Sequence, residues 1–167
     1  MHSPQNICRL ATVAAALAVV ASSANAQETN VIACQYFDGP PRSEPLGDRE
    51  GHSLSIVGVS CIVTSGPLAG GVETGRVISE FDRGKGELLM GGGVIRKPGA
   101  TAVYQITEQS IALTITDGKI TGSSIAGHSK YLLATGSFAP LAGKTGSFTI
   151  KPATPGPEQF IIEETLD

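Results

Sequence analysis

Apolar residues stand at every second position in a series of short segments, and turn-forming residues separate these segments. A period of two is typical of β-strands with one buried face. In the clearest case Ile111, Leu113 and Ile115 share one side of a strand, and Asp117 and Gly118 follow as a two-residue hairpin signal. No segment keeps a helical period over ten residues. The pattern therefore predicts an all-β domain.

The turn signals divide the chain after Gly51 into nine predicted strands. These strands are 53–63, 72–81, 87–95, 100–107, 109–116, 119–126, 128–134, 144–151 and 158–166. Because tight turns join most neighbours, the simplest topology is an antiparallel meander. Closing it into an eight-stranded barrel removes the exposed edges, and the interior of such a barrel holds side chains or one small ligand.

Three consecutive glycines, residues 91–93, lie inside one predicted strand. Backbone without Cβ lets a sheet coil or bulge, so these glycines predict a local distortion of the barrel wall. A phosphate-binding loop is the functional alternative. It is disfavoured because neither a helix nor a Lys-Ser or Lys-Thr pair follows.

Residues 1–26 have the build of a secretory signal peptide. Arg9 supplies the positive end, residues 10–21 are apolar and uncharged, and small residues lead up to Ala26, after which we expect cleavage. The apolar run is too short for a hydrocarbon core of roughly 30 Å, which disfavours an anchor. A lipid on Cys34 is disfavoured because that residue lies well beyond the apolar run. We therefore expect export to the periplasm or the medium, with no transmembrane span.

Cys34 and Cys61 are the cysteines that remain when cleavage removes Cys8. An even pair in an exported protein predicts a disulfide, which contributes roughly 3 kcal/mol by restricting the unfolded chain. We expect this bond to attach an N-terminal arm, residues 27–52, to a barrel formed by residues 53–167. Because no His stands at ligand spacing from either cysteine, we expect no metal and no other cofactor.

The composition excludes one class of partner. The chain is 16% charged and 41% hydrophobic, which is typical of folded domains. Its formal net charge is −3, and Lys and Arg are scattered singly along it. No basic face is predicted that could neutralise a run of phosphates, so nucleic acid is not an expected partner.

Residues 131–146 contain a Gly-x-Phe-x-x-x-x-Gly strand and turn. This segment resembles the corresponding one in allene oxide cyclase-like and dirigent-like barrels. The turn at 66–71 and the segment 93–101 resemble small exported bacterial proteins of that barrel type. The turns at 66–71 and 138–143 are also similar to each other, as turns at corresponding corners of a barrel would be. Lipocalin-like barrels are the alternative assignment.

This resemblance implies a closed eight-stranded antiparallel barrel whose lumen holds an apolar or aromatic guest. It also implies a homo-oligomer, since plant members are often trimers. Plant cyclases of the family steer a fatty-acid epoxide by confining it, and dirigent proteins orient phenoxy radicals. No catalytic position of the family aligns with a residue of this chain.

Glu73 is the first candidate for chemistry. In the strand 72–81 it shares a face with Val77 and Phe81. If that face points inward, the carboxylate enters the lumen near its mouth, where burial would let it act as a base or bind the polar end of a ligand. The alternative is a solvated Glu73 at the rim, and its place at the strand end favours this alternative.

Tyr104 is the second candidate, because it shares a strand face with Ile106. It is a hydroxyl donor inside the barrel or, alternatively, a core-filling side chain. We expect His52 and His128 at the surface, since no third ligand accompanies them. The segment 122–126 approaches a nucleophile elbow, but it ends in Ala and no helix follows, so hydrolysis is disfavoured.

Glu80 and Asp82 lie on the other face of the strand that carries Glu73. We expect them outside the barrel and in water, beside Arg76. They are therefore not candidates for chemistry in the lumen.

Three functions remain open. The first is a module that encloses a small apolar or aromatic molecule. The second is a cyclase or isomerase that confines its substrate, with Glu73 as the acidic residue and Tyr104 as an orienting donor. The third is a structural envelope protein with a packed core. A cavity of several hundred Å³ favours the first two.

Overall fold

The structure, a computed structural model, describes residues 27–39, 41–117, 119–153 and 159–167. The predicted signal peptide, residues 1–26, lies outside the described residues. Most of the described residues belong to strands, as the period of two predicts. The elements are β1 Thr29–Tyr36, β2 Arg42–Pro45, β3 His52–Ser65, β4 Val72–Asp82, β5 Lys85–Lys97, β6 Ala100–Thr116, β7 Lys119–Thr135, the 3₁₀ helix η1 Gly136–Leu141, β8 Thr145–Pro152 and β9 Gln159–Leu166.

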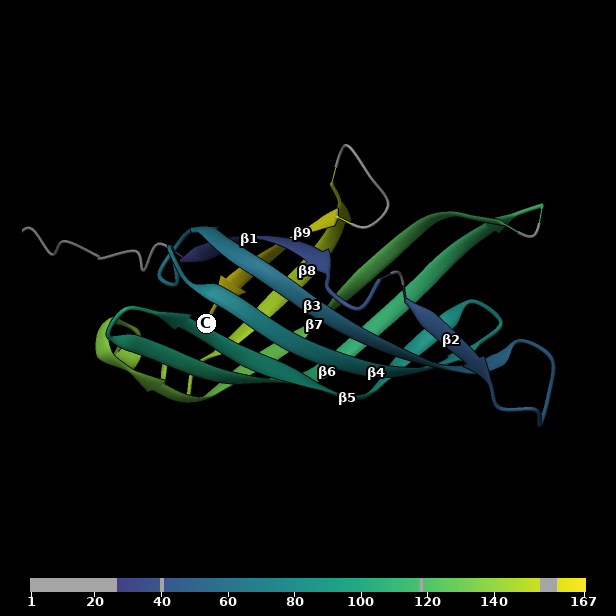
Figure 1. The fold of residues 1–167 in the computed structure, drawn as a ribbon, viewed down its shortest axis with the longest axis horizontal. Coiled ribbons are helices and arrows are strands. Elements are labelled where there is room, and N and C mark those ends of the chain that lie inside the picture. Colours follow the sequence, from purple (N-terminus) through teal and green to yellow (C-terminus); the bar gives the residue numbers. More distant parts are fainter. Residues whose placement is uncertain (1–26, 40, 118, 154–158) are drawn as a thin grey trace, which may run out of the picture.

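The strands form one antiparallel sheet that closes on itself (Figure 1). The order is β1-β9-β8-β7-β6-β5-β4-β3, and pairing of β1 with β3 completes the circle. The extra strand β2 pairs with the other half of β3, so that β1 and β2 follow one another along the same edge. The predicted closed eight-stranded meander is confirmed.

The eighth strand of the barrel comes from the segment that we expected to be an arm. Residues 29–36, as β1, pair with both β3 and β9, so the barrel does not begin at residue 53. The count of later strands differs too, because 100–107 and 109–116 are one strand, β6, and the next two predicted strands are together β7. A register shift between Ile106 and Glu108 interrupts the pairing of β6 with β7 without ending either strand.

The glycine run of β5 lies where the barrel wall is irregular, as predicted. The pairing of β4 with β5 shifts register at Ile78, and β5 pairs with β6 on either side of residues 88–91 but not through them. The wall therefore bends at this level.

Two turns close one end of the barrel. Leu68, from the turn at 66–71, and Phe138, from η1, are completely buried. They lie close together, since a Cβ added to Gly71 would approach the Phe138 ring to 3.5 Å. The two turns of similar sequence thus meet at the same end, where their apolar side chains fill the barrel.

The predicted disulfide is present. Cys34 and Cys61 face each other on β1 and β3 and are bonded. Both are buried in the core near the closed end. The bond therefore fastens the pair of strands at which the barrel closes.

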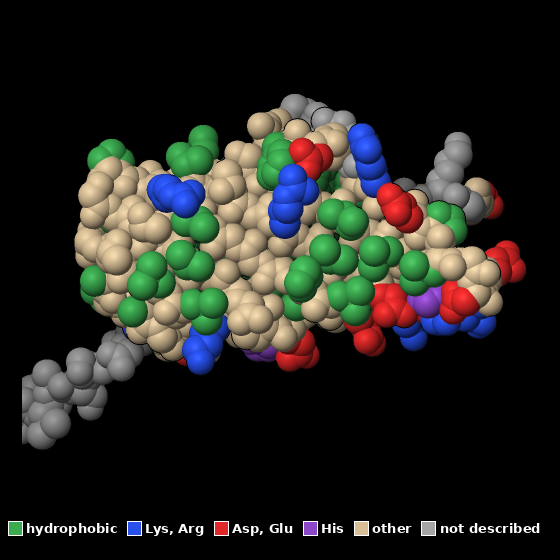
Figure 2. All heavy atoms as spheres, turned by 60° about the horizontal axis from the view of Figure 1, so that its bottom comes forward, with side chains coloured by type: hydrophobic (Ala, Val, Ile, Leu, Met, Phe, Trp, Pro, Cys, Tyr) green, Lys and Arg blue, Asp and Glu red, His purple; other side chains and the backbone are tan. Residues whose placement is uncertain are grey.

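The outer surface of β3, β4 and β5 carries apolar side chains among polar ones (Figure 2). Ile56, Ile62, Val72 and Met90 are exposed there. Acidic, basic and histidine side chains gather at one end of the same face (Figure 2). Outward positions are therefore not uniformly polar in this barrel.

Candidate functional site

A cavity of about 750 Å³ occupies the barrel between the closed end and the opposite end. At the far end it is lined by residues of the turns and hairpins, including Arg83, whose side chain is 80% exposed. We call this open end the mouth. The core of the barrel is therefore not fully packed, which disfavours the purely structural alternative.

The middle of the cavity is apolar. Every strand of the closed barrel contributes aliphatic or aromatic side chains to the lining: Ile32, Val57, Val59, Val77, Ile95, Ile106, Ile125, Phe148, Ile150, Phe160 and Ile162. A space of this size with such walls suits one small apolar molecule.

Polar side chains form the inner limit of the cavity, and we call them the polar floor. Its members are Asn30, Glu73, Tyr104, Ser129, Tyr131 and Glu164. Glu73 and Glu164 are 3% and 4% exposed, and both line the cavity. The floor lies directly on the closed end, because the Asn30 side chain accepts a hydrogen bond from the backbone N–H of Leu68 at 3.1 Å.

Glu73 has one hydrogen-bond partner among the described residues. The Tyr104 hydroxyl donates to Glu73 Oε1 at 2.5 Å, from β6 to β4 across the intervening strand β5. Glycines make this reach feasible, since a Cβ added to Gly75 or Gly93 would lie 2.8 or 2.9 Å from the Tyr104 hydroxyl. The glycines of β4 and β5 therefore open the space in which Tyr104 meets Glu73.

Glu164 is bonded far more completely. Its Oε1 accepts from the Ser129 hydroxyl at 2.5 Å. Its Oε2 accepts from the Tyr131 hydroxyl at 2.5 Å and from the Asn30 amide at 3.0 Å. Three donors from two strands, β1 and β7, hold this carboxylate in place.

The two carboxylates are joined through their tyrosines. Tyr104 and Tyr131 are neighbours across β6 and β7, with ring centroids 6.3 Å apart. Burial, opposed by the Tyr104 hydrogen bond and assisted by the charge of Glu164, raises the pKa of Glu73 to about 7. Burial also raises the pKa of both tyrosines. The floor can therefore hold or release a proton at Glu73 near neutral pH.

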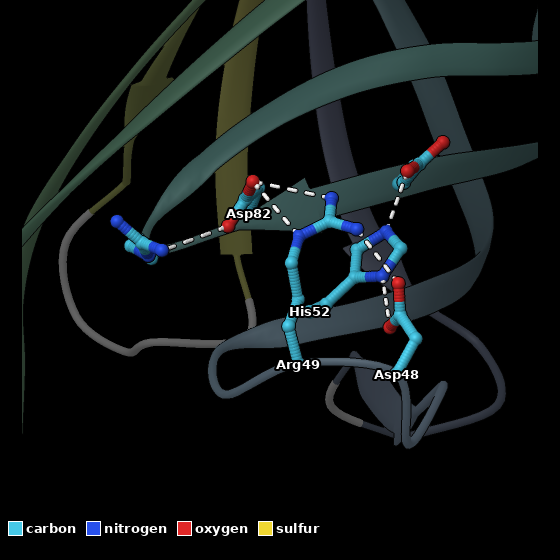
Figure 3. A network of polar contacts seen from close by, with 6 residues as sticks. Asp48, Arg49, His52 and Asp82 are labelled. Atoms are coloured by element: carbon cyan, nitrogen blue, oxygen red, sulfur yellow. Dashed lines mark hydrogen bonds and ion pairs between the residues drawn. The ribbon is translucent and has the colours of Figure 1, made fainter.

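The mouth carries a different polar cluster (Figure 3). His52, at the start of β3, is 8% exposed, with Nδ1 2.5 Å from Asp48 and Nε2 2.5 Å from Glu80. Arg49 lies between Asp48, at 2.7 Å, and Asp82, at 3.2 Å. These contacts fasten the connection between β2 and β3 to the end of β4. The hydrogen bonds to Asp48 and then Glu80 raise the pKa of His52.

The sequence predicts Glu73 and Tyr104 as candidate site residues. In the structure the two side chains are in direct contact. The favoured alternative of a solvated Glu73 is wrong, and so is its expected place near the mouth. β4 begins at the closed end and runs toward the mouth, so the first inward residue of the strand lies deep in the barrel. Tyr104 lies with it at the floor, at the opposite end of the cavity from the mouth cluster.

Of the other predictions about charged and histidine side chains, some are confirmed and others are wrong. Glu80 and Asp82 do lie outside, but their partners are His52 and Arg49, while Arg76 pairs with Asp38 at 3.0 Å. The sequence places His52 at the surface, whereas the side chain is buried between two carboxylates. His128 is exposed, as predicted.

Sequence reasoning missed Glu164 and its three donors. The signal was present in part, because Glu164 alternates with Ile162 and Leu166 on one face of the last strand. Its neighbour Glu163 points outward to Lys151 at 2.6 Å. Two adjacent glutamates cannot be assigned to faces without knowing which set of alternate residues points inward.

Two further findings bear on the class of protein. Compared with known proteins, the chain matches no protein-family model and no curated sequence. Within the described ranges, no helix has both the length and the apolar content to cross a membrane. Nor do the described His, Cys, Asp and Glu side chains form a group of three or more that could hold a metal ion.

Proposed function

We propose that this protein binds one small apolar or aromatic molecule in the lumen of its barrel. The observation that carries the proposal is the cavity of about 750 Å³ with an apolar middle and an open mouth. The resemblance to allene oxide cyclase-like and dirigent-like barrels supports it, since an enclosed guest is the habit of that group.

The proposal is tested with a neutral fluorescent probe, N-phenyl-1-naphthylamine, whose emission rises in apolar surroundings. We expect saturable binding of one probe per chain. Val77→Trp fills the lumen and should weaken binding roughly tenfold or more, because the space for the probe is lost. Ile78→Trp is the matched control, since Ile78 is the next residue and lies on the opposite face of β4. Equal effects of the two variants would contradict binding in the lumen.

A second candidate, an isomerase or cyclase that acts by confinement, is favoured by one observation. Glu73 is buried, lines the cavity, has a pKa of about 7 and is bonded to Tyr104. A base with a pKa near the working pH is suited to proton transfer, and Tyr104 would orient it. Native mass spectrometry of protein from its own host identifies a retained guest. Glu73→Ala should abolish turnover of that guest while binding persists, and unchanged turnover removes Glu73 from the reaction.

We also propose export, with cleavage after Ala26, because the disulfide between Cys34 and Cys61 is typical of exported proteins. The intact mass should correspond to a chain that begins at Gln27 and lacks two hydrogens. Two free thiols, or a chain beginning at Met1, would contradict this. The native mass spectrum also gives the number of subunits, for which the family resemblance suggests a trimer.

A further inference from the structure

The charge inside the barrel is unbalanced. The charged side chains that line the cavity are Glu73, Glu164 and Arg83. Arg83 lies at the mouth, forms its ion pair with Asp82 and is 80% exposed. It is ten residues along the chain from Glu73, or roughly 30 Å of strand. Among the described residues, no cation faces the two carboxylates at the floor.

The floor also has unused acceptor capacity. An ionised carboxylate accepts about four hydrogen bonds, and Glu73 receives one from the described residues. Glu164 receives three and is close to saturation. The remaining acceptor sites of the floor therefore belong mainly to Glu73, whose side chain lines the cavity.

A second acceptor lies farther up the lumen. Gln109 is 7% exposed and lines the cavity, and its Oε1 is buried with no hydrogen-bond partner in the described part of the chain. It is five residues beyond Tyr104 on β6, which corresponds to roughly 12 Å along the barrel axis for a tilted strand. A buried polar atom left without a partner costs free energy, so a guest that donates to it gains affinity.

We propose that the guest is an elongated apolar amine, bound with its cationic nitrogen at the polar floor between Glu73 and Glu164 and its apolar body along the middle of the lumen. This inference rests on the proposed binding function and names the class of ligand. An ammonium group supplies the missing positive charge and donates to the free acceptor sites of Glu73. A fatty carboxylate is disfavoured because it would bring a third negative charge into a buried site where the described part of the chain places no cation.

The competing cost is the removal of the ammonium group from water. A buried ion pair repays this cost only where the geometry is good and the remaining hydrogen-bonding atoms are satisfied. Here the partner carboxylates are already out of water in the free protein, so binding does not have to desolvate them again. The carboxylates of the floor are therefore preorganised for binding a cation.

Protonation of the floor sets how binding varies with pH. The titratable groups that face the site are Glu73 from β4, Tyr104 from β6, Tyr131 from β7 and Glu164 from β9. Tyr36 from β1 also lines the cavity and is titratable, and burial raises its pKa above the ordinary value of 10. The other lining side chains near the floor do not titrate: Ile32, Val59, Ile95 and Phe148. The pKa of Glu73 is about 7, so acidification neutralises the carboxylate with the free acceptors and weakens amine binding.

The test displaces N-phenyl-1-naphthylamine with three compounds of equal chain length: decylamine, decanol and decanoate. At pH 8 we expect decylamine to bind roughly tenfold or more tightly than decanoate, with decanol between them. Decylamine should weaken relative to decanol between pH 8 and pH 6. Decanoate binding as tightly as decylamine, or decanol binding more tightly, overturns the proposal even though the lumen binds. If the naphthylamine itself does not bind, the proposed function fails instead.

A variant tests whether Glu73 is responsible for the preference for decylamine over decanol. Glu73→Gln keeps the size of the side chain and removes its charge, so it should abolish the preference of decylamine over decanol while decanol still displaces the probe. Glu163→Gln is the matched control, because Glu163 lies on the outer face and pairs with Lys151. An unchanged decylamine preference in Glu73→Gln overturns the assignment. The pH comparison on the unaltered protein keeps the proposal testable should this variant not fold.

Discussion

Acidic side chains cluster at both ends of the lumen, but the two clusters differ in how they are balanced. At the mouth, Asp48, Glu80 and Asp82 lie against His52 and Arg49 in half-exposed ion pairs. At the floor, two carboxylates are almost completely buried with hydroxyl and amide donors, and none of the described residues places a cation beside them. Each carboxylate of the mouth cluster therefore has an arginine or histidine partner, although Asp82 Oδ1 accepts no hydrogen bond from the described residues. The negative charge of the floor has no such partner among the described residues, and the proposed amine ligand would supply one.

The largest difference between the two clusters should appear on loss of a carboxylate. Glu164→Ala leaves the donors of Asn30, Ser129 and Tyr131 buried without an acceptor, so we expect a loss of about 3–5 kcal/mol in the free energy of unfolding. Glu80→Ala at the half-exposed mouth should cost about 1 kcal/mol or less. Urea denaturation measures both, with Glu163→Ala as a second exposed control. Similar costs for Glu164 and Glu80 would remove the distinction between the ends.

Substitution of Glu73 should change the free energy of unfolding in the opposite direction to substitution of Glu164. The pKa of Glu73 is raised from 4.5 to about 7, so the folded protein binds more protons than the unfolded chain between these values, and stability falls as the pH rises through them. Glu73→Gln removes this dependence and should increase the free energy of unfolding at pH 8 by about 3 kcal/mol, with little change at pH 4. Urea denaturation across this range, with Glu80→Gln as control, checks it. Destabilisation by Glu73→Gln at pH 8 would show that Glu73 is a structural anchor.

Tyr104→Phe should have a smaller effect on the floor, which is a change in the pKa of Glu73. The hydroxyl bond from Tyr104 lowers the pKa of Glu73, so its loss should raise that pKa above about 7, by roughly one unit. The carboxyl ¹³C shift of Glu73 followed by NMR reports it. Tyr36→Phe is the control, because Tyr36 lines the same cavity from β1. The contact between Tyr104 and Glu73 has no electrostatic role if the pKa stays unchanged.

The mouth cluster should show the smallest effect, a local change in stability as the pH rises. Hydrogen bonds to Asp48 and Glu80 raise the pKa of His52, so its contribution to stability is complete below pH 6.5 and is lost as the pH rises through the raised value. Amide hydrogen exchange in residues 46–51, corrected for the intrinsic effect of pH, should accelerate over that interval. His52→Asn should remove the acceleration without changing binding in the lumen. A global loss of stability would show that the mouth cluster holds the barrel together.

The fold could be predicted because turns and alternation are local signals. The hairpin at Asp117, the distortion at residues 91–93 and the pairing of Cys34 with Cys61 all depend on residue types near one another or on a forced pair. The prediction of an arm is wrong for residues 29–36, which are too short a segment to be recognised as a barrel strand from local signals alone. This segment becomes a strand by pairing with β3 and β9, which are distant in sequence.

The site was less predictable because both faces of the barrel wall carry apolar residues. Along β3, Ser53 and Ser55 line the lumen while Ile56 is exposed outside, so hydrophobicity alone assigns the wrong face near the mouth. Depth is a separate problem. Whether Glu73 lies at the mouth or at the floor depends on which end the turns close, and burial of Leu68 and Phe138 decides that.

The most direct test of the account is to locate a bound apolar molecule by NMR. With N-phenyl-1-naphthylamine present, nuclear Overhauser effects should connect its ring protons to the methyl groups of Val77, Ile106 and Ile125, which line the lumen. Effects confined to Ile62 and Leu132, which are exposed on the outer surface, would contradict the account, because they would place the molecule outside the barrel.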